Sequence, residues 1–325
     1  MRKIVFFLIQ LYVLIFISAC DTNQKKNKIP SYFPQDKNQF FDSVRAEEII
    51  LGSMLFFDKR LSIDSSVSCS SCHDPKIAFT DGKIVSDGLP SHKSLRNSST
   101  LLNVRFNPTF MFDERAYNID MVSLIPLLDT NEMGMNWHRL DTLFKQDSTL
   151  TKLSYKAYQQ PCDIRSITRS LGAFMKSLHF NKSKFDDFTI SNNTIIFSTQ
   201  EIKGKDLFFG KGNCNSCHTA PLFTNHKHYN IGSEKNGSKD LGRMVGTLRK
   251  EDMFKFKTPT LRNIEITKPY FHNGKAATLE NALDFHLSKD RKTTDFDPPI
   301  LTTAERQNLI SFLKCLTDGN YILTK

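Results

Sequence analysis

Two short segments of the chain combine a pair of cysteines with a histidine at a fixed spacing. Residues 69–73 read CSSCH and residues 214–218 read CNSCH, so both match the pattern C-x-x-C-H. In c-type haem attachment, two thiols at this spacing add to the vinyl groups of the porphyrin, and the adjacent histidine reaches the iron. The sequence therefore predicts two covalently bound c-type haems. The attaching residues are Cys69, Cys72, Cys214 and Cys217, and the axial ligands are His73 and His218.

Zinc is the main alternative for paired cysteines. The two pairs of a zinc ribbon lie about 15–20 residues apart, whereas Cys72 and Cys214 are much farther apart in this chain. A thioredoxin-like dithiol would not require a histidine after each pair. Cys162 and Cys315 lie outside both motifs, and they could form a disulfide or remain buried thiols.

The first twenty residues have the composition of an export signal. A basic start is followed by an apolar run over residues 4–17, which is short for a membrane-spanning helix of about 20 residues. Ile-Ser-Ala-Cys at residues 17–20 resembles a bacterial lipobox, in which Cys20 would be lipidated. Ordinary cleavage and an uncleaved anchor are the alternatives. We expect a signal peptide over residues 1–19, a tether over residues 20–40, and an exported, periplasmic protein that a lipid anchors to a membrane.

The amino-acid composition limits the classes of partner that the protein could bind. The 325 residues are 39% hydrophobic and 24% charged, which suits a globular protein, and seven cysteines are too few for a disulfide scaffold. The net charge of +10 would suit nucleic acid, an anionic membrane or an acidic protein. Because an exported chain does not meet nucleic acid, we expect the basic surface to face an acidic redox partner or anionic lipid.

The same landmarks recur in the same order around the two motifs. Helical periodicity is strongest at residues 43–57, 164–179, 200–209, 278–288 and 303–317, and strand-like alternation is scarce. Each motif follows a segment with the pattern G-x-x-L-F-F and precedes Phe-Thr and then Thr-Leu-x-Asn. We predict a mainly α fold with long loops and little β structure. It would contain two cytochrome c-like haem domains related by an internal repeat, over residues 41–190 and 191–325.

From about residue 40 to residue 320, the chain resembles the bacterial di-haem cytochrome c peroxidases and the related MauG-type enzymes. The resemblance rests on the segments LGSMLFFDKRLS (51–62), SCHDP (71–75), AFTDG (78–82), RNS (96–98), PTLRNI (259–264) and PYFHNG (269–274). It implies that the N-terminal haem reduces hydrogen peroxide. It also implies that the C-terminal haem receives electrons from a small donor, such as cytochrome c or a cupredoxin, and that the protein could form a homodimer.

The resemblance also implies roles for particular residues. Glu132 matches the distal carboxylate that moves a proton between the two peroxide oxygens, although a solvated glutamate is the alternative. Asn97, Thr267 and Pro269 match positions whose oxygens bind Ca²⁺ between the haem domains, and ordinary turns are the alternative there. His92 lies in the loop that can supply a sixth ligand to the N-terminal haem, or it is solvated.

Two departures from the family pattern stand out. Family members usually carry Trp between the haems, whereas this chain has Phe112, so Tyr117 and Tyr270 are the alternatives for a radical. The sixth ligand of the C-terminal haem, Met in peroxidases and Tyr in MauG-type members, falls on His286. A second imidazole would make that haem less oxidising than a His/Met haem. A surface role for this histidine is the alternative, and the fallback ligands are Met244 and Met253.

These features together predict a membrane-tethered di-haem peroxidase that reduces hydrogen peroxide to water. The first alternative is a MauG-like oxidase that modifies a partner protein. The second is an electron-transfer cytochrome without peroxide chemistry. Trp137, the only tryptophan, is expected in packing or at the surface.

Overall fold

A computed structural model describes residues 29–34, 44–234, 237–289, 295 and 297–319. The expected signal peptide, most of the tether and Cys20 lie outside the described residues. Residues 38–325 form one compact unit. Of the preceding unit, only residues 29–34 are described, and they form a turn in which the Phe33 N–H donates to the Pro30 carbonyl (2.9 Å). Within the described part of the chain, no helix is long and apolar enough to cross a membrane.

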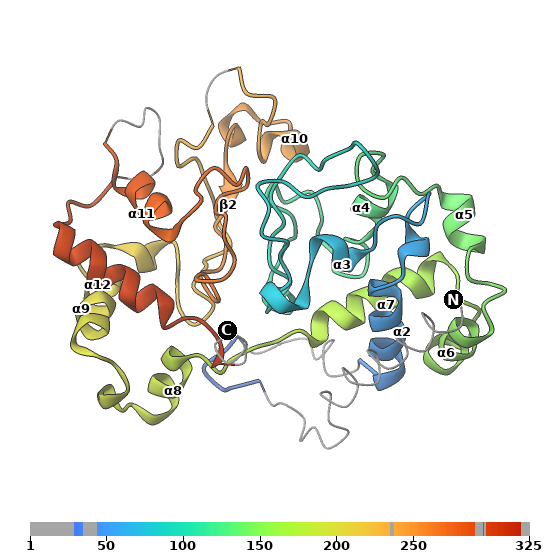
Figure 1. Cartoon of the computed structure of the whole chain (residues 1–325), viewed down its shortest axis with the longest axis horizontal. Coiled ribbons are helices and arrows are strands. Elements are labelled where there is room, and N and C mark those ends of the chain that lie inside the picture. Colours follow the sequence, from blue (N-terminus) through green and yellow to red (C-terminus); the bar gives the residue numbers. More distant parts are fainter. Residues whose placement is uncertain (1–28, 35–43, 235–236, 290–294, 296, 320–325) are drawn as a thin grey trace. The chain divides into compact units, whose positions relative to one another are not determined.

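The compact unit consists mainly of helices joined by long loops (Figure 1). The α-helices are α2 (Ala46–Phe56), α3 (Cys69–Cys72), α4 (Leu124–Leu128), α5 (Trp137–Thr142), α6 (Ser148–Tyr158), α7 (Ile164–Ser177), α8 (Lys184–Ser191), α9 (Thr199–Phe209), α10 (Met244–Thr247), α11 (Leu279–Leu287) and α12 (Thr303–Lys314). The 3₁₀ helices are η1 (Lys59–Leu61), η2 (Pro75–Ile77), η3 (Val104–Phe106), η4 (Thr194–Ile196), η5 (Cys214–Ser216) and η6 (Lys250–Asp252). Two short antiparallel strands, β1 (His228–Tyr229) and β2 (Phe256–Lys257), pair with His228 opposite Lys257. The predicted mainly α fold is confirmed.

Two pairs of helices repeat the same close packing. In α2, a Cβ added to Gly52 would lie 1.9 Å from the carbonyl oxygen of Ser170 in α7. In α9, a Cβ added to Gly204 would lie 1.9 Å from the carbonyl oxygen of Asn308 in α12. Only glycine permits so close an approach of two helix backbones. The G-x-x-L-F-F segments of the sequence therefore mark equivalent helices in the two halves.

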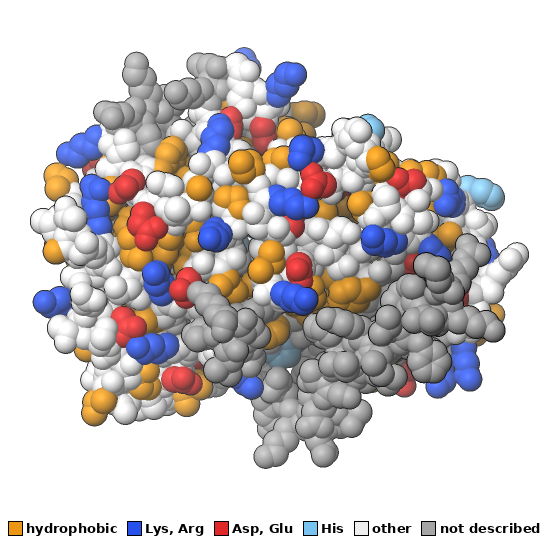
Figure 2. Space-filling view, in the orientation of Figure 1, with side chains coloured by type: hydrophobic (Ala, Val, Ile, Leu, Met, Phe, Trp, Pro, Cys, Tyr) orange, Lys and Arg blue, Asp and Glu red, His pale blue; other side chains and the backbone are white. Residues whose placement is uncertain are grey.

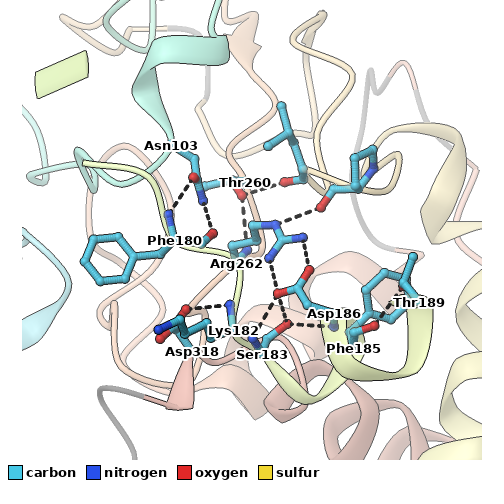
Figure 3. A network of polar contacts seen from close by, with 12 residues as sticks. Asn103, Phe180, Lys182, Ser183, Phe185, Asp186, Thr189, Thr260, Arg262 and Asp318 are labelled. Atoms are coloured by element: carbon cyan, nitrogen blue, oxygen red, sulfur yellow. Dashed lines mark hydrogen bonds and ion pairs between the residues drawn. The ribbon is translucent and has the colours of Figure 1, made fainter. Parts of the chain in front are cut away.

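A second equivalence involves the asparagines of the Thr-Leu-x-Asn segments. Asn103 and Asn263 both have left-handed backbones, with φ of 60° and 61°. The side-chain oxygen of Asn103 accepts the Phe180 N–H (3.0 Å), and that of Asn263 accepts the Asp318 N–H (2.8 Å). Figure 3 shows the first of these bonds. Each asparagine thus ties the loop behind a haem motif to the chain that leaves the closing helix of its half.

Each half has its own apolar core. The core of the N-terminal half includes Leu55, Phe56 and Leu171. The core of the C-terminal half is built around phenylalanines, with ring centroids 5.3 Å apart for Phe208 and Phe312. This packing uses many of the 27 phenylalanines of the chain, because edge-to-face aromatic contacts add to simple burial.

The two cores show to which half the remaining cysteines and α8 belong. Cys162 packs in the N-terminal core and Cys315 in the C-terminal core, and both are free thiols. The disulfide alternative is therefore wrong, because the two thiols belong to separate cores. Phe185 of α8 belongs to the C-terminal core, so α8 packs with that half, whereas the expected boundary after residue 190 falls inside this helix.

A buried ion pair fixes α8 to the C-terminal half (Figure 3). The guanidinium of Arg262 donates two hydrogen bonds to the carboxylate of Asp186 (2.8 and 2.9 Å), and both side chains are buried. The Ser183 hydroxyl also donates to Asp186 (2.6 Å). Burial alone would raise the pKa of Asp186, but the hydrogen bonds and positive charge of Arg262 outweigh it and lower the pKa below its usual range. The folded state therefore favours the ionised carboxylate.

Replacing Asp186 with Asn should lower the free energy of unfolding by about 3–5 kcal/mol, because a buried guanidinium would lose its counter-charge. In the unmodified protein, this contribution is present above the ordinary pKa of 3.8 and is lost as the pH falls through the lower folded value. Urea unfolding of the holoprotein at neutral and acidic pH measures both effects.

The exposed pair of Asp284 and Arg306 (2.8 Å) provides the control. Asp284→Asn should change the unfolding free energy by less than about 1 kcal/mol, because solvent screens surface ion pairs. Equal losses in the two variants at neutral pH would contradict the role of the buried pair.

Candidate functional site

One cavity of about 680 Å³ lies between the two haem motifs. Its wall includes the four motif cysteines and both motif histidines. Other lining residues come from the loops that follow each motif in the two halves. The fold therefore places both predicted attachment sites on the wall of the same cavity.

The first motif is held by its own polar side chains and by a later loop. Ser68 caps the N-terminus of α3, and its N–H donates to the Ser71 hydroxyl (3.0 Å). The Nδ1 atom of His73 lies 3.0 Å from the Phe79 carbonyl oxygen and 3.1 Å from the Ser98 hydroxyl. A carbonyl accepts only from a protonated Nδ1, so Nε2 carries the lone pair that can bind iron.

The second motif orients its histidine in the same way. The Nδ1 atom of His218 lies 3.2 Å from the carbonyl oxygens of Phe223 and Pro259. Phe79 and Phe223 occupy equivalent places in the two Phe-Thr segments. Burial and then the positive charge of His286 lower the pKa of His218 to about 4, and burial lowers the pKa of His73. Both imidazoles are therefore neutral at neutral pH, as metal ligation requires.

These residues fit two c-type haems better than zinc. Zinc needs thiolates or imidazoles grouped around one point, and among the described residues no three His, Cys, Asp or Glu side chains form such a group. Burial raises the pKa of Cys69 to about 12 and that of Cys214 to about 11, so both thiols are protonated. Two cysteines and one oriented histidine at each end of a shared cavity are the donors that covalent haem needs.

Glu132 faces this cavity near the first motif. Its loop is a tight turn, in which the Glu132 N–H donates to the Asp129 carbonyl (3.0 Å). The loop with Gly88 packs on this turn, and a Cβ on Gly88 would lie 1.7 Å from the Asn131 carbonyl oxygen. Burial is the first cause that raises the pKa of Cys72 to about 11, and the negative charge of Glu132 is among the others. The carboxyl group therefore lies close to the first attachment site.

The surroundings of the half-buried Glu132 favour the protonated form of its carboxyl group. Burial and the negative charge of Asp129 raise its pKa, and Arg115 opposes them. Such a group keeps its proton to higher pH than an exposed glutamate and can donate it inside a pocket. Ser123, a buried residue whose hydroxyl has no hydrogen-bond partner among the described residues, lines the same cavity. Sequence reasoning did not identify this serine.

His286 lies on α11 and lines the cavity that His218 also lines. Its Nδ1 atom is 2.8 Å from the Ala282 carbonyl oxygen one turn earlier, so Nε2 is the ring nitrogen suited to iron. The effect of its charge on the pKa of His218 shows that the two imidazoles are near one another. Met244 and Met253 are not among the cavity-lining residues, so the structure does not bring these fallback ligands to the site.

The structure does not bring His92 to the cavity. This histidine is exposed, its Nδ1 atom lies 3.0 Å from the Pro90 carbonyl oxygen, and it is absent from the cavity wall. Neighbouring residues Asp87, Gly88 and Ser94 do line the wall. The tip of the loop therefore turns outward while its two arms face the cavity.

The residues expected to bind calcium lie where the two halves meet. Asn97, Thr267 and Pro269 all line the cavity. The Asn97 N–H donates to the His272 carbonyl (2.7 Å), and its side-chain amide donates to the Lys83 carbonyl (2.7 Å). This places oxygen-bearing residues of both halves at one boundary, which is consistent with the ligands that Ca²⁺ prefers.

Aromatic side chains occupy the region between the motifs. Phe112 lines the cavity, and its ring centroid lies 6.4 Å from that of His272. His272 stacks on Phe256 at 3.5 Å with an interplanar angle of 10°. Tyr117 and Trp137 are exposed, whereas Tyr270 is buried and donates its hydroxyl proton to the Ile264 carbonyl (2.7 Å). Of the two alternative tyrosines, only Tyr270 therefore lies at the cavity.

A buried ion cluster joins the halves beside this region, and sequence reasoning missed it. Arg96 donates to both carboxylate oxygens of Asp240 (2.7 Å each) and lies 2.8 Å from Asp113. All three side chains are at least nine-tenths buried. Of these three residues, only Arg96 lies in a segment that the sequence singled out, the RNS segment. Its two partners come from distant loops.

Comparisons with known proteins agree with this arrangement. Residues 46–194 match the family model described as di-haem cytochrome c peroxidase. Cytochrome-c peroxidase IdrP2 from Denitromonas iodatirespirans is 31% identical over 301 residues, which cover 84% of this chain and 82% of that protein. Methylamine utilization protein MauG from Methylorubrum extorquens is 28% identical over 276 residues, covering 83% and 78% of the two chains.

A solved structure extends the similarity to the fold. The crystal structure of a MauG-like protein associated with microbial copper homeostasis superposes with a TM-score of 0.81 at 27% sequence identity. The match covers 91% of this chain and 96% of that one. With two haem-attachment motifs on one cavity and these relatives along most of its length, the chain belongs to the di-haem cytochrome c peroxidase and MauG family.

Proposed function

We propose that the protein is a di-haem c-type peroxidase that reduces hydrogen peroxide to water at its N-terminal haem. The observation that carries the proposal is Glu132, a carboxyl group of raised pKa on the cavity wall beside the first attachment motif. The reaction consumes one peroxide, two electrons and two protons and yields two waters. Relatives named cytochrome-c peroxidase support the same activity.

The bound haems would supply an iron that binds peroxide and a store for the two electrons. Glu132 would take a proton from one peroxide oxygen and deliver it to the other, which departs as water. Its partial burial supports this role, because desolvation raises the pKa of a carboxyl group, which then holds its proton to higher pH. Ser98 and the Phe79 carbonyl would fix the orientation of His73, which would hold the iron of this haem.

Electrons would enter through the C-terminal haem, whose two axial ligands would be His218 and His286. Both histidines line the cavity, and both engage Nδ1 with a backbone carbonyl. The donor would be a small redox protein such as cytochrome c or a cupredoxin. On the face shown in Figure 2, Lys and Arg side chains are scattered among acidic ones. The described residues on that face therefore form no single basic patch for the donor.

Further parts of the proposal rest on the sequence and the family. Ca²⁺ would bind at Asn97, Thr267 and Pro269, where the halves meet. Export to the periplasm, lipidation at Cys20 and a homodimer complete it. A MauG-like oxidase that modifies a partner protein is the second candidate, and it is favoured by the similarity to MauG and to a MauG-like structure.

Glu132→Gln should reduce peroxide-dependent oxidation of reduced cytochrome c by about 100-fold or more, because the amide cannot move a proton between the two oxygens. Both haems should stay attached, since the substitution changes neither motif. Stopped-flow donor oxidation and a haem count on the purified holoprotein measure the two effects.

Glu251→Gln is the matched control, because Glu251 is exposed on η6. It should leave turnover unchanged. Retention of full turnover by Glu132→Gln would overturn the assignment of this carboxyl group.

His286→Met should raise the reduction potential of the C-terminal haem, because thioether ligation favours the reduced iron more than a second imidazole does. Redox titration followed by absorbance measures the change. His138→Met, at an exposed position of α5, should leave both potentials unchanged. An unchanged potential together with an unchanged EPR spectrum in His286→Met would show that His286 is not a ligand.

A further inference from the structure

Two c-type haems would bring four propionate groups into this protein, so the cavity must accommodate negative charge. Burying a carboxylate without a counter-charge is unfavourable by several kcal/mol. The cavity wall should therefore offer cations that the protein itself does not neutralise. This inference rests on the two-haem part of the proposed function and not on the peroxidase activity.

Three permanent or readily formed cations line the wall, namely Arg96, Arg115 and Lys257. Arg96 is matched by the carboxylates of Asp240 and Asp113 (2.7 and 2.8 Å). Arg115 lies 3.4 Å from Asp113. Lys257 differs from both arginines, because it forms no ion pair in the described part of the chain. No carboxylate oxygen there lies within 4.0 Å of its Nζ atom.

The amine of Lys257 is held in a defined place. Its Nζ atom donates to the Thr109 carbonyl (2.7 Å), and its backbone N–H donates to the Phe112 carbonyl (2.8 Å). Lys257 lies in β2 of the C-terminal half, whereas residues 109–112 belong to the N-terminal half. The side chain therefore crosses the boundary between the halves and lies next to the segment that carries Phe112.

The electrostatics of this position favour an anionic ligand. Burial lowers the pKa of Lys257 to about 8, and the charges of Glu114 and Asp113 oppose this without contacting the amine. The nearby His226 is also buried, and burial followed by the charge of Lys257 lowers its pKa to about 4. A partly buried ammonium with one carbonyl partner retains two N–H groups that could donate to a carboxylate.

We propose that Lys257 binds a haem propionate at the boundary between the two halves. The contact would link the haem edge, the Phe112 segment and β2 in one hydrogen-bonded unit. A fixed ammonium beside the haem stabilises the reduced, less positive iron, so it raises the reduction potential of that haem. Lys257 would thus be a positioning residue that sets the potential and the orientation of one haem.

The test uses the holoprotein variants Lys257→Met and Lys257→Arg. In Lys257→Met, redox titration should show a shift of one haem potential to a more negative value, and resonance Raman should show a shift of one propionate bending mode. Lys257→Arg should retain most of the native potential and mode, because the guanidinium keeps the charge and the donors. The haem count should stay at two per chain in both variants.

Lys250→Met is the control, because Lys250 is exposed on η6. It should change neither the potentials nor the Raman spectrum. If Lys257→Met does not fold, Lys257→Gln retains a donor to the Thr109 carbonyl and should show the same two shifts. Native potentials and a native propionate mode in whichever neutral variant folds would overturn the proposal, whatever its peroxide turnover.

Discussion

Three consecutive residues connect the first haem site to the other half of the protein. The Arg96 guanidinium binds the Asp240 carboxylate (2.7 Å), and the Asn97 N–H donates to the His272 carbonyl (2.7 Å). Both partners belong to the C-terminal half. The Ser98 hydroxyl then lies 3.1 Å from Nδ1 of His73, the histidine of the first C-x-x-C-H motif. Of the two contacts that orient this imidazole, the Phe79 carbonyl lies close by in the chain, whereas Ser98 is placed by a segment that is bonded to the other half.

The energetics of Arg96 make this connection specific. A buried guanidinium is tolerated only where carboxylates surround it, and Asp113 and Asp240 come from different halves. Burial opposes ionisation of Asp240, but the hydrogen bonds and charge of Arg96 lower its pKa below the usual range. If the halves separated, the buried charges would lose their partners. The ion cluster thus favours one relative position of the halves, and that position brings both haem motifs to one cavity.

Much of this arrangement could be predicted from the sequence, because it is encoded locally. The C-x-x-C-H motifs, the glycines of α2 and α9 and the five predicted helices need only short-range patterns. α6 and α8 were missed, since they carry many polar residues and start at the capping side chains of Asp147 and Ser183. Glu132 and His286 were singled out by their positions relative to the family's motifs. Their neighbours in the sequence would not have identified either residue.

Long-range pairing could not be predicted in the same way. Arg96 and Asp240 are separated by 144 positions, and no periodicity links them. The position of Lys257 between the halves was equally hidden, because it follows from the pairing of β1 and β2 against a loop of the other half. For His92, the position in the sequence suggested a haem ligand, but the structure of the loop exposes the side chain to solvent.

In the proposed function, electrons from an external donor reduce peroxide at this protein. The most direct measurement is the ratio of donor oxidised to peroxide consumed, with purified holoprotein and a reduced one-electron donor such as cytochrome c. A peroxidase oxidises two donor molecules for every peroxide, and the reaction continues until either the donor or the peroxide is exhausted. Consumption of peroxide without donor oxidation would indicate the oxidase, and the absence of any reaction would indicate an electron carrier. Either result would contradict the peroxidase function.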